Sequence, residues 1–182
     1  MCRMISQQGE IDLITDIFPQ LENVKKLPFD QGDRTLTNAN AFQLTDVIVR
    51  HHDRLLLGEM EWGVHPTFET DKAAYHKRKL TMVNARRDKL LDINSYWNSK
   101  GLIRNPVLIP VNKVYEHRHI ETWDTPVPYA ISTNHQPEDE YFYIPGVYQV
   151  YETKQPHGQT RKHSSFAIIT TEANTTKSYE IS

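Results

Sequence analysis

The only cysteine of the chain, Cys2, directly follows the initiator methionine. Removal of Met1 would leave one residue that carries both a free α-amine and a thiol. An α-amine titrates at about pH 8, so a usable fraction of it is neutral at physiological pH. A modest lowering of the thiol pKa is enough to form the thiolate. A neutral amine condenses with an aldehyde to an imine, and the neighbouring thiol can close on the same carbon to give a thiazolidine. Chain termini are usually disordered, so position alone favours a residue without a role, and other motifs must decide.

The composition indicates an ordinary globular protein. With 182 residues, of which 38% are hydrophobic, we expect a single domain over residues 1–182. No apolar run is long enough to span a bilayer, and the first residues lack the apolar stretch of a secretory signal. A single cysteine excludes an internal disulfide and a cysteine-based zinc cluster. These features predict a cytoplasmic protein without a membrane partner, and we expect a monomer.

The charge excludes a globally basic nucleic-acid binder, because 21 Lys and Arg face 23 Asp and Glu, for a net charge of −2. DNA binding would depend on a local patch, although short charge runs are more often solvated surface. Three short basic runs occur, at 77–79, 86–87 and 161–163, and the last is expected in a loop between two strands.

The hydrophobic pattern predicts two helices at the edge of a strand-rich domain. Apolar spacing predicts a helix near 9–18 that ends before Pro19, and a second near 88–99 that ends before Gly101. Residues 20–37 are polar and are expected to form a loop. Val-, Ile- and Leu-rich segments at 46–51 and 54–61 predict a hairpin, and further strands are expected at 107–116, 129–132, 141–151 and 164–171. The fold class is therefore α+β, with twisted, mostly antiparallel strands that approach a barrel and present a groove with Cys2 at its base.

Seven short strings, in a fixed order, carry a family resemblance. They are Cys2, Trp-Gly-Val-His-Pro at 62–66, Val-Asn-Ala-Arg at 83–86, Ile-Pro-Val-Asn-Lys-Val-Tyr-Glu at 109–116, Pro-Tyr-Ala-Ile at 128–131, Gly-Val-Tyr at 146–148 and Ala-Ile-Ile-Thr-Thr-Glu-Ala-Asn at 167–174. In order and spacing they resemble the SOS-response-associated peptidase (SRAP) family over almost the entire chain.

The resemblance implies a sensor of abasic sites in single-stranded DNA. Members lose the initiator methionine and crosslink the new terminal cysteine, here Cys2, to the ring-opened sugar aldehyde as a thiazolidine. Asn84 matches the asparagine that holds the sugar or the amine, and Glu116 matches a glutamate that moves protons during ring opening and imine formation. Because the aldehyde belongs to the lesion, the resemblance implies no cofactor and no metal.

The resemblance also implies four DNA contacts. Arg86 would pair with a phosphate through its guanidinium fork, and Phe68 would stack on an unpaired base. Asn40 and Thr171 are the other two expected contacts. Trp62, a large aromatic residue, is expected to pack in the core. Without the family, Asn84 is a turn or cap residue, whereas Arg86 and Glu116 are exposed surface residues.

The chain departs from the family pattern at several positions. Arg3 replaces the glycine of the usual Cys-Gly-Arg start, Asn40 alone remains of a Tyr-Asn motif, and His117 stands where a tryptophan is expected. Near the end of this sequence the family has an Ile-His motif, but Ser182 stands where its histidine would lie. We therefore expect a domain that lacks the family's C-terminal segment and the proton-transfer group within it.

Three other functions stay open. Nine histidines, including His51, His52, His117 and His119, suggest a metal-dependent enzyme, although no HExxH or similar motif supports it. An N-terminal-nucleophile amidohydrolase would use Cys2 to attack an amide, with its own amine as base. A non-catalytic module would bind single-stranded DNA with no dependence on Cys2.

Overall fold

The computed structural model describes residues 4–7, 11–24, 26–30, 43–118, 124–132, 141–154 and 158–171. In chain order its elements are β1 (Met4–Ser6), α1 (Ile11–Ile17), β2 (Leu21–Asn23), β3 (Leu44–His51), β4 (Arg54–Trp62), α2 (Lys72–Thr81), β5 (Asn84–Arg86), α3 (Arg87–Leu91), α4 (Tyr96–Ser99), the 3₁₀ turn η2 (Leu102–Arg104), β6 (Pro106–Val111), β7 (Lys113–Arg118), β8 (Val127–Ile131), β9 (Phe142–Lys154) and β10 (Thr160–Thr170).

A five-stranded barrel forms the centre of the molecule. The large sheet has the order β2-β4-β3-β6-β9-β10-β5, and an additional pairing of β4 with β10 closes strands β4, β3, β6, β9 and β10 on themselves. The predicted hairpin is confirmed as β3 and β4, joined at His52, whose φ of 53° is left-handed. Closure removes the free edges that an open sheet would expose. The predicted fold class, mostly antiparallel and barrel-like with a few helices, is confirmed.

One edge of β10 carries two short parallel partners in succession. Phe166 pairs with Trp62 at the end of β4, and Ile168 pairs with Asn84 at the start of β5. Between them, the Gly63 N–H donates to the Phe166 carbonyl at 2.7 Å, and the Ile168 N–H donates to the Val83 carbonyl at 3.1 Å. The chain therefore leaves this edge at Gly63 and returns to it at Val83.

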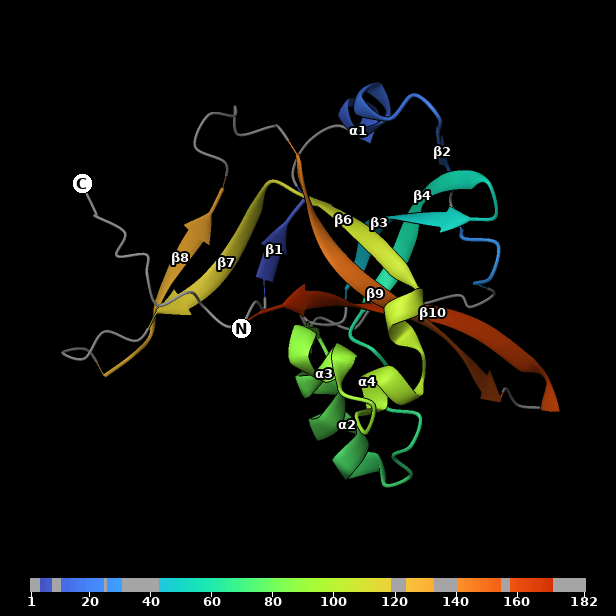
Figure 1. Cartoon of the computed structure of the whole chain (residues 1–182), viewed down its shortest axis with the longest axis vertical. Helices are drawn as coiled ribbons and strands as arrows, with labels where there is room; N and C mark the ends of the chain where they lie inside the picture. Colours follow the sequence, from blue (N-terminus) through green and yellow to red (C-terminus); the bar gives the residue numbers. More distant parts are fainter. Residues whose placement is uncertain are drawn as a thin grey trace.

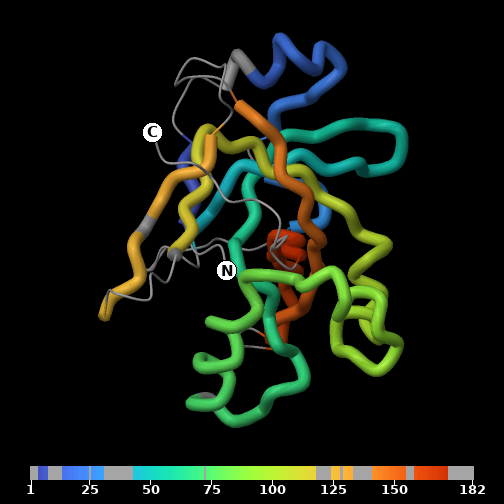
Figure 2. The backbone as a smooth tube through the Cα atoms, turned by 60° about the vertical axis from the view of Figure 1, so that its left-hand side comes forward, coloured from blue at the N-terminus to red at the C-terminus, as the bar shows by residue number. Residues whose placement is uncertain are grey.

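A three-stranded sheet, β1-β7-β8, projects from the barrel on the left of Figures 1 and 2. The single strand predicted at 107–116 is two strands, because the chain bends at buried Asn112, whose N–H donates to the Ser6 carbonyl at 2.9 Å. Before the bend β6 pairs with β9, and after it β7 pairs with β1 and β8. At this bend the chain therefore passes from the barrel sheet to the three-stranded sheet.

The helix predicted near 9–18 is confirmed as α1, whereas the one predicted near 88–99 is wrong in part. It is two short helices, α3 and α4, and the break has a local cause. The Asp92 carboxylate accepts from the Asn94 N–H at 3.0 Å, and the Ser95 hydroxyl accepts from the Asn98 N–H at 3.2 Å. These short polar side chains satisfy the backbone at a turn and start a new helix.

The elements that were not predicted include β1, β2, α2 and β5. Strand β2 lies inside the expected loop 20–37 and pairs in parallel with β4, and β5 has only three residues. Helix α2 begins after Asp71, whose carboxylate accepts from the Ala74 N–H at 2.7 Å. The ends of β9 and β10 extend past their predicted limits, so the basic run 161–163 lies within β10 and not in a loop.

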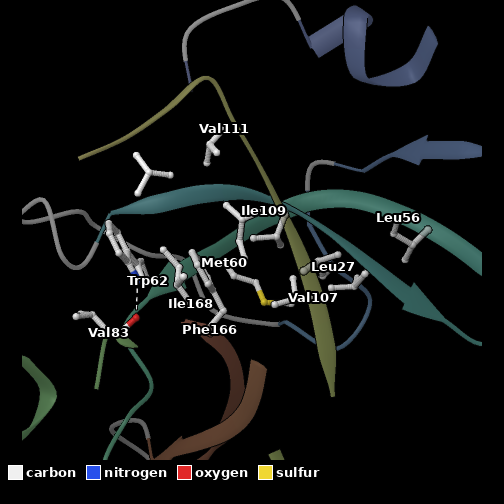
Figure 3. Close-up of a cluster of buried hydrophobic side chains, with 13 residues drawn as sticks. Leu27, Leu56, Met60, Trp62, Val83, Val107, Ile109, Val111, Phe166 and Ile168 are labelled. Carbon is white, nitrogen blue, oxygen red and sulfur yellow. Dashed lines mark hydrogen bonds between the residues drawn. The ribbon is translucent and has the colours of Figure 1, made fainter. Parts of the chain in front are cut away.

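A buried apolar cluster fills the barrel interior, and Trp62 lies toward one end of it (Figure 3). Trp62 is 1% exposed, its indole stacks on Phe166 with 6.3 Å between centroids, and its Nε1–H donates to the Val83 carbonyl at 2.9 Å. The prediction that Trp62 packs in the core is confirmed. A second buried cluster, which includes Val64, Leu90 and Val147, holds α3 against the outside of the barrel.

Candidate functional site

The N-terminal strand is fixed to the body of the protein from Met4 onward. In the antiparallel β1–β7 ladder, Met4 lies opposite Tyr115 and Ile5 opposite Val114. Gln7, the residue after β1, is also held by hydrogen bonds. Its Nε2 donates to the carbonyls of Asp46, at 2.9 Å, and Pro110, at 2.7 Å. Cys2 and Asn40 lie outside the described residues. The structure therefore fixes the chain two residues after Cys2, where Met4 enters the sheet.

A cavity lies where β1 meets the barrel. Its volume is about 180 Å³, and its lining residues are Met4, Ile5, Gln43, Thr45 and Trp62. Trp62 contributes a wall that cannot move freely, because its ring is buried and hydrogen-bonded. The cavity is therefore a preformed space next to the first described residue of the chain.

Asn84 directly follows Val83, the residue that holds the Trp62 wall of this cavity by a hydrogen bond. It is 6% exposed, begins β5, and follows Val83, whose carbonyl holds the Trp62 indole. The structure thus links Asn84 to the cavity through Trp62 and Val83. Because Asn84 lies in a strand, the alternative that it caps a helix is wrong. Its side chain is buried.

Glu116 lies on β7, one residue past the partner of Met4. It is half-buried and lies opposite Tyr129 on β8. Because side chains alternate along a strand, Glu116 shares a face with Val114, which is part of the barrel cluster. The glutamate therefore points to the same side of the small sheet as the residues that pack onto the barrel.

Arg86 and Thr171 come together at the end of β10. Arg86 pairs in register with Thr170, the residue before Thr171, and both Arg86 and Thr171 are exposed. The Arg86 guanidinium makes two hydrogen bonds to Asp88, at 2.9 and 3.0 Å. These bonds hold the pKa of Asp88 below its usual range. An exposed fork already aligned on one anion is suited to exchange it for a phosphate.

Phe68 lies apart from these residues, on the segment between β4 and α2. Its ring is 49% exposed and lies 4.8 Å from the ring of Tyr96 on α4. An aromatic side chain that is half in solvent has a free face for stacking.

A family model described as SOS response associated peptidase (SRAP) matches residues 1–179. The chain belongs to the SRAP family. Three solved structures are similar to it, one from Bacteroides thetaiotaomicron and two from Bordetella bronchiseptica. The first is 20% identical with a TM-score of 0.63 and covers 95% of this chain and 69% of its own. The second is 15% identical with a TM-score of 0.62, over 96% and 74%. The third, a phage-related protein, is 15% identical with a TM-score of 0.55, over 94% and 69%. A search of curated proteins found no match.

These structural likenesses establish the SRAP fold, and the family match gives the coarse activity in its name, a peptidase associated with the SOS response. No helix in the described part of this SRAP chain is long and apolar enough to cross a membrane. Across the same segments, no three His, Cys, Asp or Glu side chains gather as a group that would hold a metal ion.

A half-buried ionic cluster in the SRAP chain was missed by sequence reasoning. The Glu61 carboxylate accepts from Lys79 and lies 3.2 Å from His65 Nε2, while the other ring nitrogen of His65 bonds to the Tyr75 hydroxyl. Burial raises the pKa of Glu61, but hydrogen bonds and charge from His65 and Lys79 outweigh it and lower the pKa to about 2. Burial raises the pKa of Tyr75 to about 12. The cluster ties α2 to the barrel, and only His65, within the motif at 62–66, was visible as a signal.

We expect the Glu61 cluster to make stability fall in acid. A carboxylate with a pKa of about 2 when folded and about 4.5 when unfolded stabilises the protein fully above about pH 5. That contribution, on the order of 3 kcal/mol, is lost progressively as the pH falls from about 5 to about 2. Urea unfolding at pH 7 and pH 3 measures the loss.

The variants that test this assignment are Glu61→Gln and Glu152→Gln. Glu61→Gln should be less stable at pH 7 and should lose less on acidification than the parent. The matched control Glu152→Gln removes an exposed carboxylate on β9 and should keep the parent's pH dependence. If the free energy of unfolding fell equally from pH 7 to pH 3 in the parent and in Glu61→Gln, the assignment would be contradicted.

Proposed function

We propose that this protein senses abasic sites in single-stranded DNA and crosslinks to them through Cys2 after loss of Met1. Family membership supports the reaction class. The observation that carries the proposal is the docking of β1, which joins the sheet opposite Tyr115, beside Glu116, at the mouth of a cavity walled by Trp62. A reagent at the chain terminus needs such a fixed entry point, because an untethered terminus gives no orientation.

Chain geometry supports the reach of Cys2 to this cavity. Cys2 is two residues before Met4, and two extended residues span at most about 7 Å. Since Met4 itself lines the cavity, the amine and thiol of Cys2 can lie within it or at its rim.

The reaction balances without a cofactor. Hydrolysis of the Met1–Cys2 bond consumes one water and frees the amine, which is the peptidase step. The amine nitrogen then adds to the aldehyde carbon, and loss of one water gives the imine. The thiol sulfur bonds to the same carbon while its proton passes to nitrogen, which closes the thiazolidine. Glu116 supplies the proton for the departing hydroxyl, and Asn84 orients the sugar.

The DNA contacts follow from exposure. Arg86 and Thr171, adjacent at the end of β10, would hold a phosphate, and Phe68 would stack on a base. Asn40 stays a proposed contact on the family pattern alone.

The deciding experiment incubates purified protein with three single-stranded oligonucleotides. One carries an abasic site, one carries a tetrahydrofuran analogue that has no aldehyde, and one is intact. We expect a denaturant-resistant band with the abasic strand alone, and an intact mass that shows loss of Met1. Absence of the band from Met1-free protein would reject the proposal. Release of a free acid from an amide substrate, without a DNA adduct, would favour the amidohydrolase instead.

We expect Glu116→Gln to slow adduct formation about 100-fold, because glutamine keeps the shape and hydrogen bonding of the side chain but cannot deliver a proton. This value is at the low end for proton transfer, since amines react with aldehydes unaided. Single-turnover rates at saturating abasic DNA measure the effect. The matched control Glu152→Gln should react at the parent's rate, and a parental rate for Glu116→Gln would remove Glu116 from the mechanism.

A further inference from the structure

Thr45 is a polar residue at a position of β3 that faces the barrel interior. Side chains alternate along a strand, so Thr45 shares its face with Val47 and Val49, which belong to the buried apolar cluster. In the β3–β4 ladder it lies opposite Met60, another member of that cluster. The Thr45 side chain is itself buried, with 5% exposure. A hydroxyl therefore stands where the pattern of the strand favours an apolar side chain.

The Thr45 hydroxyl is poorly satisfied within the described part of the protein. There its one hydrogen bond goes to the Gln43 carbonyl at 3.4 Å, whereas about 2.7–2.8 Å is usual between two oxygens. This long bond uses the hydroxyl proton, and no donor among the described residues reaches the oxygen. Buried polar groups nearly always have a good partner, so the Thr45 oxygen is available to a ligand.

Thr45 is also part of the wall of the cavity beside β1. Among the described lining residues, Met4 and Ile5 offer apolar side chains, and the Trp62 indole N–H is already bonded to Val83. Gln43 is polar but exposed, so Thr45 is the buried polar side chain of this described wall. A ligand that enters the cavity and carries a hydroxyl would meet Thr45.

We propose that Thr45 binds the hydroxyl that appears on C4 of the abasic sugar when its ring opens, and so selects the open-chain form of the lesion. Ring opening breaks the bond between C1 and the ring oxygen. The electron pair stays on that oxygen, which takes a proton, while the hydroxyl on C1 loses its proton and becomes the aldehyde. The ring oxygen of the closed form has no proton to donate to Thr45, and the open form has one. The inference rests on the proposed function for the identity of the sugar.

This contact would serve the reaction by changing a population. Only the open chain carries the aldehyde that the Cys2 amine attacks, and the open chain is the minor form of the lesion in solution. A site that binds the minor form more tightly shifts the equilibrium toward it by the ratio of the two affinities. Thr45 is therefore a specificity-determining residue, whereas Glu116 keeps the role of moving protons.

The test uses two single strands that cannot crosslink, so its outcome does not depend on Cys2. One carries a borohydride-reduced abasic site, which is an open chain with the C4 hydroxyl and no aldehyde. The other carries the tetrahydrofuran analogue, whose closed ring has no such hydroxyl. Anisotropy of the labelled strands gives both dissociation constants. We expect the parent to bind the reduced strand about fivefold more tightly, which corresponds to one net hydrogen bond.

Three variants separate the hydroxyl from the shape of the side chain. Thr45→Val keeps the shape but removes the hydroxyl, and it should bind the two strands equally. Thr45→Ser keeps the hydroxyl and should retain the parent's preference. The matched control Thr160→Val removes an exposed hydroxyl at the start of β10 and should also retain the preference.

Urea denaturation checks that the effect is not structural. Thr45→Val should be at least as stable as the parent, because valine suits an interior-facing position of a strand. A purely structural role for the hydroxyl would destabilise this variant and leave the ratio of the two dissociation constants unchanged, which would overturn the proposal. Equal binding of the two strands by the parent would overturn it as well.

The assignment of Thr45 and the sensor function fail separately. If the parent forms the abasic adduct but shows no preference for the reduced strand, the assignment is wrong and the crosslinking proposal stands. If no adduct forms but the preference is present and is lost in Thr45→Val, the assignment stands and the crosslinking chemistry is wrong.

Discussion

Cys2→Ala should form no denaturant-resistant adduct with abasic single-stranded DNA. The substitution keeps the amine and the backbone of the terminus but removes the thiol, so the thiazolidine cannot close. An imine hydrolyses in denaturant, and the expected loss is therefore complete. A denaturing gel of protein mixed with the abasic strand measures it, with the tetrahydrofuran strand as the background.

Cys2→Ser separates the two halves of the reaction. A free serine amine should still form the imine, which borohydride reduction converts into a stable secondary amine. Adduct from Cys2→Ser only with borohydride, and from the parent without it, would show that the amine attacks first and the sulfur locks the product. A stable adduct from Cys2→Ala without a reductant would contradict the proposed chemistry. Anisotropy on lesion-free DNA should be unchanged in both variants.

Trp62→Ala should destabilise the protein by about 3–5 kcal/mol, the usual cost of deleting a fully buried large aromatic ring. Trp62 is 1% exposed and stacks on Phe166, and its loss leaves the Val83 carbonyl without its indole donor. Since a domain of this kind is stable by only about 5–15 kcal/mol, the variant is close to unfolding. Urea denaturation gives the difference in the free energy of unfolding.

Trp62→Phe is the matched control, because it keeps a ring on Phe166 and removes the hydrogen bond and part of the volume. We expect it to cost clearly less than Trp62→Ala. If Trp62→Phe retains the fold, its abasic adduct should still form more slowly than the parent's, since the ring also walls the cavity. Equal stability of Trp62→Ala and the parent would disprove that the Trp62 ring stabilises the core.

The long strands could be predicted from the sequence because their signals are local. The hairpin of β3 and β4 follows from two apolar runs around the turn-prone pair His52 and Asp53. Trp62 was expected in the core from its residue type. The family strings carried the fold class, since their order matches one known arrangement over residues 1–179.

The elements that were missed depend on partners far away in the chain. The three residues of β5 are a strand only because β10 offers them an edge. Helix α2 is mostly polar, and its links to the barrel include the ionic contact of Lys79 with Glu61 and the bond of Tyr75 to His65, which no hydrophobic period reveals. The break between α3 and α4 is the reverse case, in which Asp92 and Ser95 cap the chain locally against a pattern that favoured one helix.

For the candidate site, the residue types of Cys2, Asn84 and Glu116 indicated a chemistry, but their spacing along the chain could not indicate a cavity. That cavity depends on β1 meeting β7 and on Trp62 lying behind it. The sequence likewise did not indicate that the fold places Arg78 over the ring of Phe68 and Lys100 over the ring of Tyr96.

Strands β4 and β5 pair in succession along one edge of β10, and this has a consequence for how such proteins diversify. Residues 64–82 depart from the strand edge and rejoin it almost where they left, between the bonds to Phe166 and Ile168. Insertions or exchanges within this excursion leave the barrel's closure untouched, because both anchor points belong to the same rigid strand. Phe68 and Arg78 sit on the excursion, whereas Trp62 and Asn84 flank it. Substitutions there would change the proposed DNA contact at Phe68, while the barrel residues that line the cavity stay in place.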